Sequence, residues 1–143
     1  MGSKLRTASW IMLAVVGVLV LLVSLISAGL AYRGDFPVGG VSIGEIASGR
    51  DAVLIGLRGA RGTAAAWGAA WAVLFLGVVV GPYRRGDVAS WWGILASLVV
   101  LTAVAGARVP FTGNPMGIST PLTLLVLGIV ALLLDVKRLS GPR

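Results

Sequence analysis

Four long apolar stretches alternate with polar links along this chain. They cover residues 10–31, 63–80, 88–107 and 116–134, and none contains an ionisable side chain. A helix of about 20 apolar residues crosses the ~30 Å hydrocarbon layer of a bilayer, because each residue adds about 1.5 Å. The pattern predicts an all-α fold in a single domain. The predicted fold is an integral membrane four-helix bundle with spans at about 10–31, 63–80, 88–107 and 118–136.

The link between the first two spans, residues 32–62, is the longest and has room for structure of its own. Its beginning, rich in Gly and Pro, indicates an irregular stretch, and residues 42–45 (Ser-Ile-Gly-Glu) then match a capping box. We predict an amphipathic helix over about 43–58 that lies on the membrane surface or covers the bundle. Its apolar face holds Ile43, Ile46, Val53, Leu54 and Leu57. Gly59 and Gly62 would allow a sharp turn into the second span.

The other links are short and carry helix start and stop signals. Residues 81–87 end the second span, and Asp87 is placed to cap the third, where a carboxylate also favours the positive end of the helix. Residues 108–110 (Arg-Val-Pro) end the third span, and residues 111–119 predict a turn-rich loop. Thr120-Pro121 resembles an N-cap followed by proline at the first helical position, which indicates the start of the fourth span.

Composition and charge change this picture little. Hydrophobic residues make up 57% of the 143 residues and charged residues 12%, whereas about a quarter of a soluble domain is charged. The net charge of +7 would suggest nucleic acid in a soluble protein. Here the charges lie in the links, where they suit membrane topology and anionic lipid headgroups. We therefore expect the lipid bilayer as a partner and no nucleic acid.

The positions of Lys and Arg predict the orientation of the spans. One side of the membrane would hold Lys4, Arg6, Arg84, Arg85, Lys137, Arg138 and Arg143, and the other Arg33, Arg50, Arg58, Arg61 and Arg108. Cytoplasmic segments near span ends carry the excess of these residues, which places both termini in the cytoplasm. The preference for Arg over Lys, with abundant Gly, Ala and Val, favours a prokaryotic plasma membrane.

The chain lacks the side chains that most catalytic and metal sites require. There is no Cys and no His, and there are five acidic residues, which excludes disulfides, thiol chemistry, haem bound through His or Cys, and ordinary zinc sites. Ser24, Ser27, Ser97 and Thr102 lie within the spans without a base in reach. We expect no catalytic residues, no metal and no cofactor.

Arginine and tryptophan side chains are the candidates for a ligand site. Arg50 projects from the middle of the predicted apolar face, where its guanidinium would meet lipid phosphate. Alternatively it would turn inward, to pair with Asp35, Glu45 or Asp51 or to hold an anionic ligand at the mouth of the bundle. Trp67 and Trp71 are four residues apart and share one helix face. They form part of an interfacial aromatic belt or a stacking surface for a hydrophobic ligand.

Two further sets of residues suggest contacts with other molecules. Gly77 and Gly81 form a GxxxG pattern, and Ala89, Gly93 and Ser97 follow the same spacing. Such lines allow close helix packing in lipid, within the bundle or between subunits. Tyr83, Arg84 and Arg85 are candidate contacts for lipid headgroups, or anchors that follow the positive-inside rule.

Residues 82–87 (Pro-Tyr-Arg-Arg-Gly-Asp), followed by Trp91-Trp92, resemble a pattern in small bacterial four-span membrane proteins of unassigned function. In those proteins a Tyr-Arg-Arg-Gly turn and an aromatic pair open the third span. They carry Glu-Arg-Trp after the glycine, where this chain has Asp87-Val88-Ala89. The resemblance implies the four-span layout and no particular activity.

These observations favour a non-catalytic function. We predict an accessory, scaffold or assembly subunit that packs against copies of itself or against a larger membrane complex. The alternative is a carrier of lipid or another hydrophobic ligand, or an oligomeric channel or transporter for a small solute. In that case Arg50, Arg58 and Arg61 would form a mouth that attracts anions.

Overall fold

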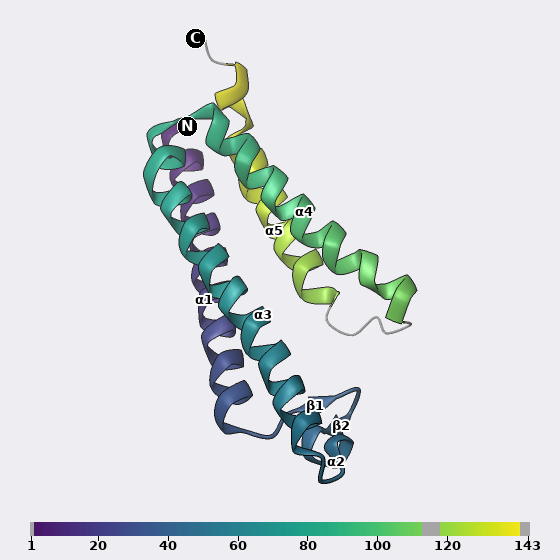
Figure 1. Cartoon of the computed structure of the whole chain (residues 1–143). Helices are drawn as coiled ribbons and strands as arrows, with labels where there is room; N and C mark the ends of the chain where they lie inside the picture. The colour runs from purple at the N-terminus through teal and green to yellow at the C-terminus, as the bar shows by residue number, and fades with distance from the viewer. Residues whose placement is uncertain (1, 113–117, 141–143) are drawn as a thin grey trace. The chain divides into compact units, whose positions relative to one another are not determined.

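Three helices are long and apolar enough to cross a membrane: Lys4–Arg33, Asp51–Tyr83 and Val88–Ala107. They belong to a computed structural model that describes residues 2–112 and 118–140. The described chain is helical apart from one short β-hairpin, which confirms the all-helical prediction (Figure 1). The fourth apolar stretch forms a shorter helix, Ser119–Leu134. Most of the predicted loop at 111–119 and Arg143 lie outside the described residues.

The chain divides into two compact units, residues 18–73 and residues 1–17 with 74–143. Helix α1 (Gly2–Arg33) and helix α3 (Asp51–Val78) contribute to both units. Helix α1 contains the whole predicted first span. It ends where Gly34 donates its N–H to the Leu30 carbonyl at 3.1 Å, shortly before Pro37, which cannot donate a helical hydrogen bond.

A β-hairpin follows α1 in the first unit. Strands β1 (Pro37–Val38) and β2 (Val41–Ser42) pair antiparallel, with Val38 opposite Val41. Gly39 and Gly40 join them with φ angles of 62° and 89°. Both values lie in the left-handed region that a two-residue turn of type I′ requires and that glycine adopts without strain.

The helix predicted over 43–58 is two helices. Ser42 caps helix α2 (Ile43–Ala47) by accepting the Glu45 N–H at 3.2 Å, which confirms the predicted N-cap. Helix α2 ends after one turn because Ser48 and Gly49 take φ angles of 47° and 78°. A left-handed residue ends a helix by turning its backbone out of the helical path.

Helix α3 begins at Asp51 and continues into the second predicted span without interruption. The expected turn at Gly59 and Gly62 was therefore wrong. Gly62 instead leaves space for Tyr32, whose ring would lie 2.7 Å from a Cβ at that position. A short π-helix, η1 (Val79–Tyr83), extends α3 and contains Pro82. Pro82 has no N–H, so an α-helical hydrogen bond is missing here.

In the second unit, residues 84–87 connect η1 to helix α4 (Val88–Thr112). Gly86 has a φ of 103°, and hydrogen bonds from Gly86 to Tyr83 and from Asp87 to Pro82 form a Schellman motif. Asp87 caps α4 as predicted, because its carboxylate accepts the Ser90 N–H at 2.7 Å. Helix α4 continues through Pro110 to Thr112, beyond its predicted end.

Helix α4 packs against helix α5 (Ser119–Leu134) (Figure 1). Gly128 lies against the buried Leu98 side chain, and the Trp91 indole donates to the Leu132 carbonyl at 3.2 Å. Helix α5 starts after Ile118, with no side-chain cap from Thr120. A 3-10 helix, η2 (Val136–Ser140), follows it.

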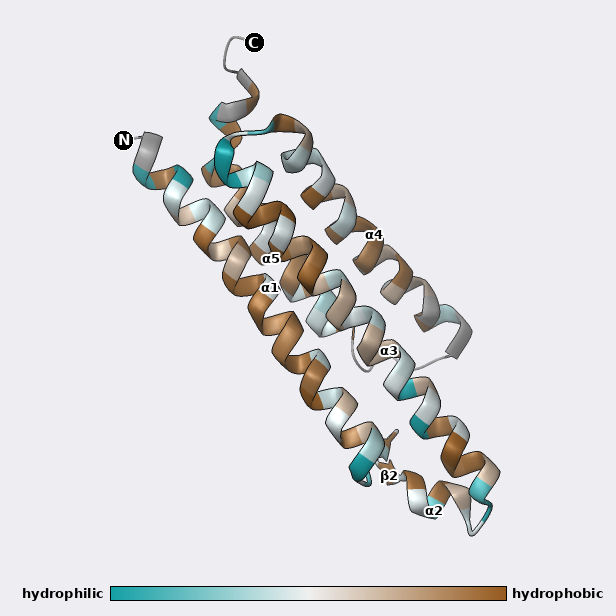
Figure 2. Ribbon diagram, turned by 60° about the vertical axis from the view of Figure 1, so that its left-hand side comes forward, coloured by the Kyte–Doolittle hydropathy of each residue, from teal (hydrophilic) through white to brown (hydrophobic). Residues whose placement is uncertain are grey.

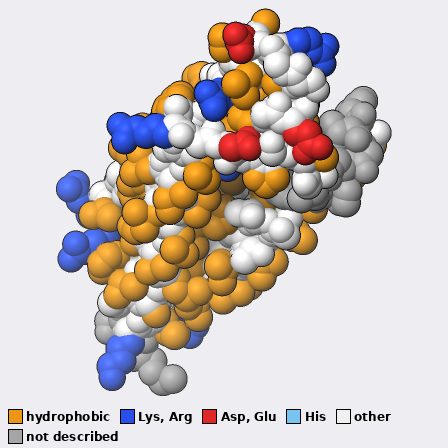
Figure 3. Space-filling view, turned by 90° about the horizontal axis from the view of Figure 1, so that it is seen from below, with side chains coloured by type: hydrophobic (Ala, Val, Ile, Leu, Met, Phe, Trp, Pro, Cys, Tyr) orange, Lys and Arg blue, Asp and Glu red, His pale blue; other side chains and the backbone are white. Residues whose placement is uncertain are grey.

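Large apolar side chains cover much of the described surface. Examples are Ile26 on α1, Leu74 on α3 and Val100 on α4, all more than half exposed. Apolar residues colour the middle of the long helices in Figure 2, and hydrophobic side chains fill much of the face seen in Figure 3. This exposure suits helices surrounded by lipid better than helices surrounded by water.

Candidate functional site

Residues 34–50 fold into a small cap on the first unit. Phe36, Ile43 and Ala47 are buried, and the Ile43 N–H donates to the Phe36 carbonyl at 3.1 Å. The cap therefore has an apolar interior of its own. The Val-Gly-Gly-Val sequence at 38–41 is a hairpin signal that the sequence analysis passed over as irregular chain.

Asp35 joins the start of the cap to its short helix α2. A hydrogen bond from the Ser42 side chain lowers the pKa of Asp35, although desolvation acts against it. The Gly44 N–H donates to the Asp35 carboxylate at 3.4 Å and lowers this pKa further. Ser42 thus contacts Asp35 at the start of the cap and Glu45 in its helix.

All three candidate ligand arginines contact the chain itself, and two of them, Arg58 and Arg61, join separate segments. The Arg61 guanidinium lies over the Phe36 ring, with 4.1 Å from its central carbon to the ring centroid, and its Nε donates to the Ser27 hydroxyl at 3.1 Å. Arg58 Nη2 donates to the Gly34 carbonyl at 3.4 Å. Both side chains fasten α3 to the end of α1 and to the start of the cap.

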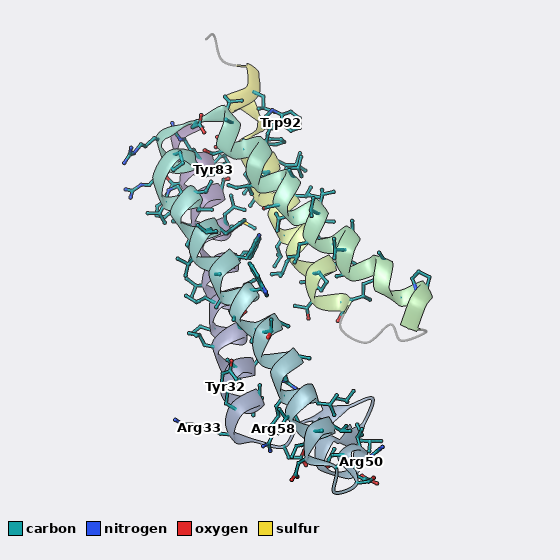
Figure 4. All side chains as sticks on the ribbon, viewed as in Figure 1. Tyr32, Arg33, Arg50, Arg58, Tyr83 and Trp92 are labelled. Atoms are coloured by element: carbon teal, nitrogen blue, oxygen red, sulfur yellow. The ribbon has the colours of Figure 1, made fainter. Side chains whose placement is uncertain are left out.

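Arg50 does not lie in the middle of a helix face. It is an exposed residue in the connection between α2 and α3, and its Nε donates to the Ala47 carbonyl at 3.4 Å. The predicted position of Arg50 on an apolar helix face was wrong, because the helix breaks at Ser48 and Gly49. Figure 4 shows Arg50 in this connection and Arg58 closer to Tyr32 and Arg33.

The two tryptophans of the candidate ligand site differ in their surroundings. Trp67 is 74% exposed, whereas Trp71 is partly buried and contacts other residues of the chain. An exposed indole at the apolar surface suits the aromatic-belt interpretation better than an enclosed stacking pocket.

The predicted small-residue faces are open in this chain. A Cβ added at Gly77, Gly81 or Gly93 would meet no other atom within 4 Å. Ala89 is exposed, and the Ser97 hydroxyl donates to the Ile94 carbonyl of its own helix at 2.9 Å. Among the described residues, no other helix therefore approaches closely at these three glycines.

Close packing occurs at other glycines. A Cβ at Gly17 would lie 2.7 Å from Leu76, and one at Gly68 would lie 2.6 Å from the Ser24 hydroxyl. Gly62 and Gly128 are equally tight. Gly68 belongs to a line of small residues with Ala64 and Ala72, which was a usable signal. The other three are single glycines whose partners lie far away in the sequence.

Tyr83 is an interior residue, so its assignment as a headgroup contact was wrong. Its side chain is 0% exposed, and its hydroxyl lies 2.6 Å from the Ser9 hydroxyl of α1. This contact brings the start of α1 to the end of η1. Figure 4 shows Tyr83 among the helices and Trp92 on the outside of α4.

Arg84 and Arg85 are exposed, as a headgroup contact requires. The Arg84 guanidinium lies over the Trp10 ring at 4.9 Å, and Arg6 Nη2 donates to the Arg84 carbonyl at 2.7 Å. Arg6 and Trp10 lie 78 and 74 positions from Arg84 in the sequence, so the spacing around the turn did not predict these two contacts. Residues 84–87 are called the basic turn below.

The described residues contain no group of three His, Cys, Asp or Glu side chains that could hold a metal ion. No protein-family model, curated protein or solved structure matches this chain. The geometry of its helices, glycines and arginines therefore carries the functional argument.

Proposed function

We propose that this chain is a non-catalytic integral membrane protein of a prokaryotic plasma membrane that acts as an assembly or accessory subunit. It crosses the bilayer four times, through α1, α3, α4 and α5, and its polar links and cap face water. Three helices of sufficient length and apolarity support this, together with the apolar helix α5. The 16 residues of α5 span about 24 Å, a mismatch that local thinning of the bilayer accommodates.

Both termini lie on the cytoplasmic side in this proposal. The starts of α1 and α4 and the ends of η1 and α5 meet in the second unit, through the Ser9–Tyr83 and Trp91–Leu132 hydrogen bonds. Lys4, Arg6, Arg84 and Arg85 therefore lie at one end of that unit. The excess of Lys and Arg at cytoplasmic span ends supports this orientation.

The open glycine positions are the observation that carries the assembly role. Glycine in a helix costs about 1 kcal/mol relative to alanine, and Gly77, Gly81 and Gly93 gain no packing within the described chain. In lipid, small residues on a helix surface let another helix approach closely. A partner helix would supply the contacts that offset this cost.

The packed glycines show how this chain uses the residue elsewhere. Gly17, Gly68 and Gly128 each lie under a side chain of another helix, where a Cβ would not fit. Gly77 and Gly93 also lie in long apolar helices, but no side chain of another helix fills the space beside them. We infer that the filling side chains come from a second polypeptide, a copy of this chain or a larger membrane protein.

Native mass spectrometry after gentle extraction tests the assembly role. We expect multiples of the 14.6 kDa chain or a reproducible additional protein mass. Gly77→Leu with Gly93→Leu should shift the protein to single chains, because a leucine side chain blocks close approach. Val99→Leu is the control, since Val99 is exposed on α4 and lies about 120° around the helix from Gly93.

A single chain without a partner protein in the wild type would overturn the proposal, as would leucine variants that assemble normally. If that single chain retained one small hydrophobic molecule, a carrier function would replace it, and the exposed indole of Trp67 would be the first contact to test.

A further inference from the structure

The start of α1 is fastened to the basic turn by Arg6. Its Nη2 donates to the Arg84 carbonyl at 2.7 Å. A Cβ at Gly86 would lie 2.8 Å from this Arg6 nitrogen, so the absence of a side chain at Gly86 lets the guanidinium approach the turn. The charge of Arg6 is thereby held beside the backbone of Arg84.

Trp10 holds the second charge at the same place. The Arg84 guanidinium lies 4.9 Å from the centroid of the Trp10 ring, a cation–π contact that restricts the side chain. Arg85 is the next residue and is exposed. Contacts with the chain therefore hold two guanidinium groups at one short turn, and Arg85 adds a third positive charge to the same turn.

The contacts that hold these groups involve uncharged partners, since Arg6 donates to a backbone carbonyl and Arg84 contacts an indole ring. Asp87, the acidic residue of the turn, is engaged elsewhere, because its carboxylate accepts the N–H and the hydroxyl of Ser90. Like charges held this close repel one another. An anion from outside the chain would remove that repulsion and accept the N–H groups.

We infer that Arg6, Arg84 and Arg85, with Trp10, bind the phosphodiester of an anionic phospholipid such as phosphatidylglycerol. Guanidinium groups match the geometry of phosphate oxygens and bind them through paired hydrogen bonds. The cluster lies at the end of the apolar helix that starts at Lys4, and indoles favour the interfacial level of a bilayer. The exposed Leu5 and Ile11 side chains nearby suit acyl chains.

Native mass spectrometry of the full chain with defined lipids tests this site. The protein is delipidated in detergent and mixed with equimolar phosphatidylglycerol and phosphatidylcholine, and the retained lipid is counted as the collision energy rises. We expect preferential retention of phosphatidylglycerol. Arg6→Gln with Arg84→Gln should lower that retention by about tenfold or more, the range expected when charge-assisted hydrogen bonds are lost.

Two single variants distinguish a loss of lipid binding from a loss of folding. Arg85→Gln removes an exposed guanidinium that makes no hydrogen bond or ring contact within the described residues, and it should lower retention several-fold with unchanged helicity. Lys4→Gln is the control, because Lys4 is two residues from Arg6 and therefore points about 200° away around the helix. It should retain phosphatidylglycerol like the wild type.

Three results would overturn the inference. The first is equal retention of the two lipids by the wild type. The second is loss of phosphatidylglycerol to the same extent in Lys4→Gln as in Arg85→Gln. The third is displacement of the lipid by millimolar inorganic phosphate or by a short single-stranded oligonucleotide, which would assign the cluster to a free anion or to nucleic acid. The site is independent of the assembly role, which depends on Gly77 and Gly93.

Discussion

The cap at residues 34–50 and the basic turn at residues 84–87 both connect long helices, yet they use arginine in opposite ways. At the cap, Arg61 covers the Phe36 ring and Arg58 donates to the Gly34 carbonyl. At the basic turn, Arg84 and Arg85 are exposed, and the nearby Asp87 is occupied by Ser90. Arg58 and Arg61 hold the cap to the long helices, whereas Arg84 and Arg85 keep exposed side chains that can contact other molecules.

The difference follows from what each connection can bury. The cap has Phe36, Ile43 and Ala47 in its interior and acidic side chains at Asp35 and Glu45. The basic turn is four residues long, and its buried neighbour is Tyr83. An arginine becomes part of the fold where an aromatic ring and backbone carbonyls surround it, and it remains a surface charge where the chain offers fewer partners.

Truncating a buried side chain of the cap should cause the largest loss of stability. Ile43 is fully buried, so Ile43→Ala should destabilise the cap by about 2–5 kcal/mol. Hydrogen–deuterium exchange in detergent should show faster exchange of the amides at 34–48 and unchanged exchange in α4 and α5. Ile55→Ala, at a side chain that is 69% exposed, should leave the cap unchanged. Equal effects of the two variants would show that the cap has no interior of its own.

Replacing one arginine of each connection by glutamine should change the free energy of unfolding by an intermediate amount. Arg61→Gln loses the contact with Phe36 and the hydrogen bond to Ser27, and it should cost about 1–2 kcal/mol of unfolding free energy. Arg85→Gln should change it by less than about 0.5 kcal/mol. Thermal unfolding followed by circular dichroism compares them. If Arg85→Gln were as destabilising as Arg61→Gln, the contrast between the two connections would not hold.

The smallest expected effect is the pH dependence of the cap. The pKa of Asp35 is lowered by hydrogen bonds that exist in the folded cap, so its contribution is present above the unfolded pKa of about 3.9. It is lost as the pH falls through the lower folded value. The Gly44 amide resonance, followed by NMR from neutral to acidic pH, should therefore titrate with a midpoint below 3.9. A midpoint at or above that value would contradict the hydrogen-bonded arrangement, and Asp35→Asn should abolish the titration.

The helices and their local caps could be predicted from the sequence, because both depend on nearby residues. The apolar runs predicted where α1, α3 and α4 lie, and Ser42 and Asp87 cap their helices as expected. Such side chains accept hydrogen bonds from N–H groups three residues away, which a sequence pattern captures directly.

The glycines and Tyr83 could not be assigned in the same way. Gly49 has a positive φ just after the end of a helix, whereas Gly62 lies inside a helix, where Tyr32 approaches it from another helix. Tyr83 looked like an interfacial aromatic residue because its partner, Ser9, is 74 positions earlier in the sequence. These roles are decided by contacts between helices, which spacing along one helix does not reveal.

The π-helix at Val79–Tyr83 determines the direction, around the helix axis, of the side chains that follow it. A widened turn of this kind acts as a one-residue insertion in an α-helix, and each residue of an α-helix turns the chain by about 100°. The position of Tyr83 opposite Ser9, and the direction in which Arg84 and Arg85 leave the helix, therefore depend on the number of residues in this segment. Deletion of one residue from this segment would rotate Tyr83 away from Ser9 by about 100°. A tyrosine at a neighbouring position would then be needed to restore the contact.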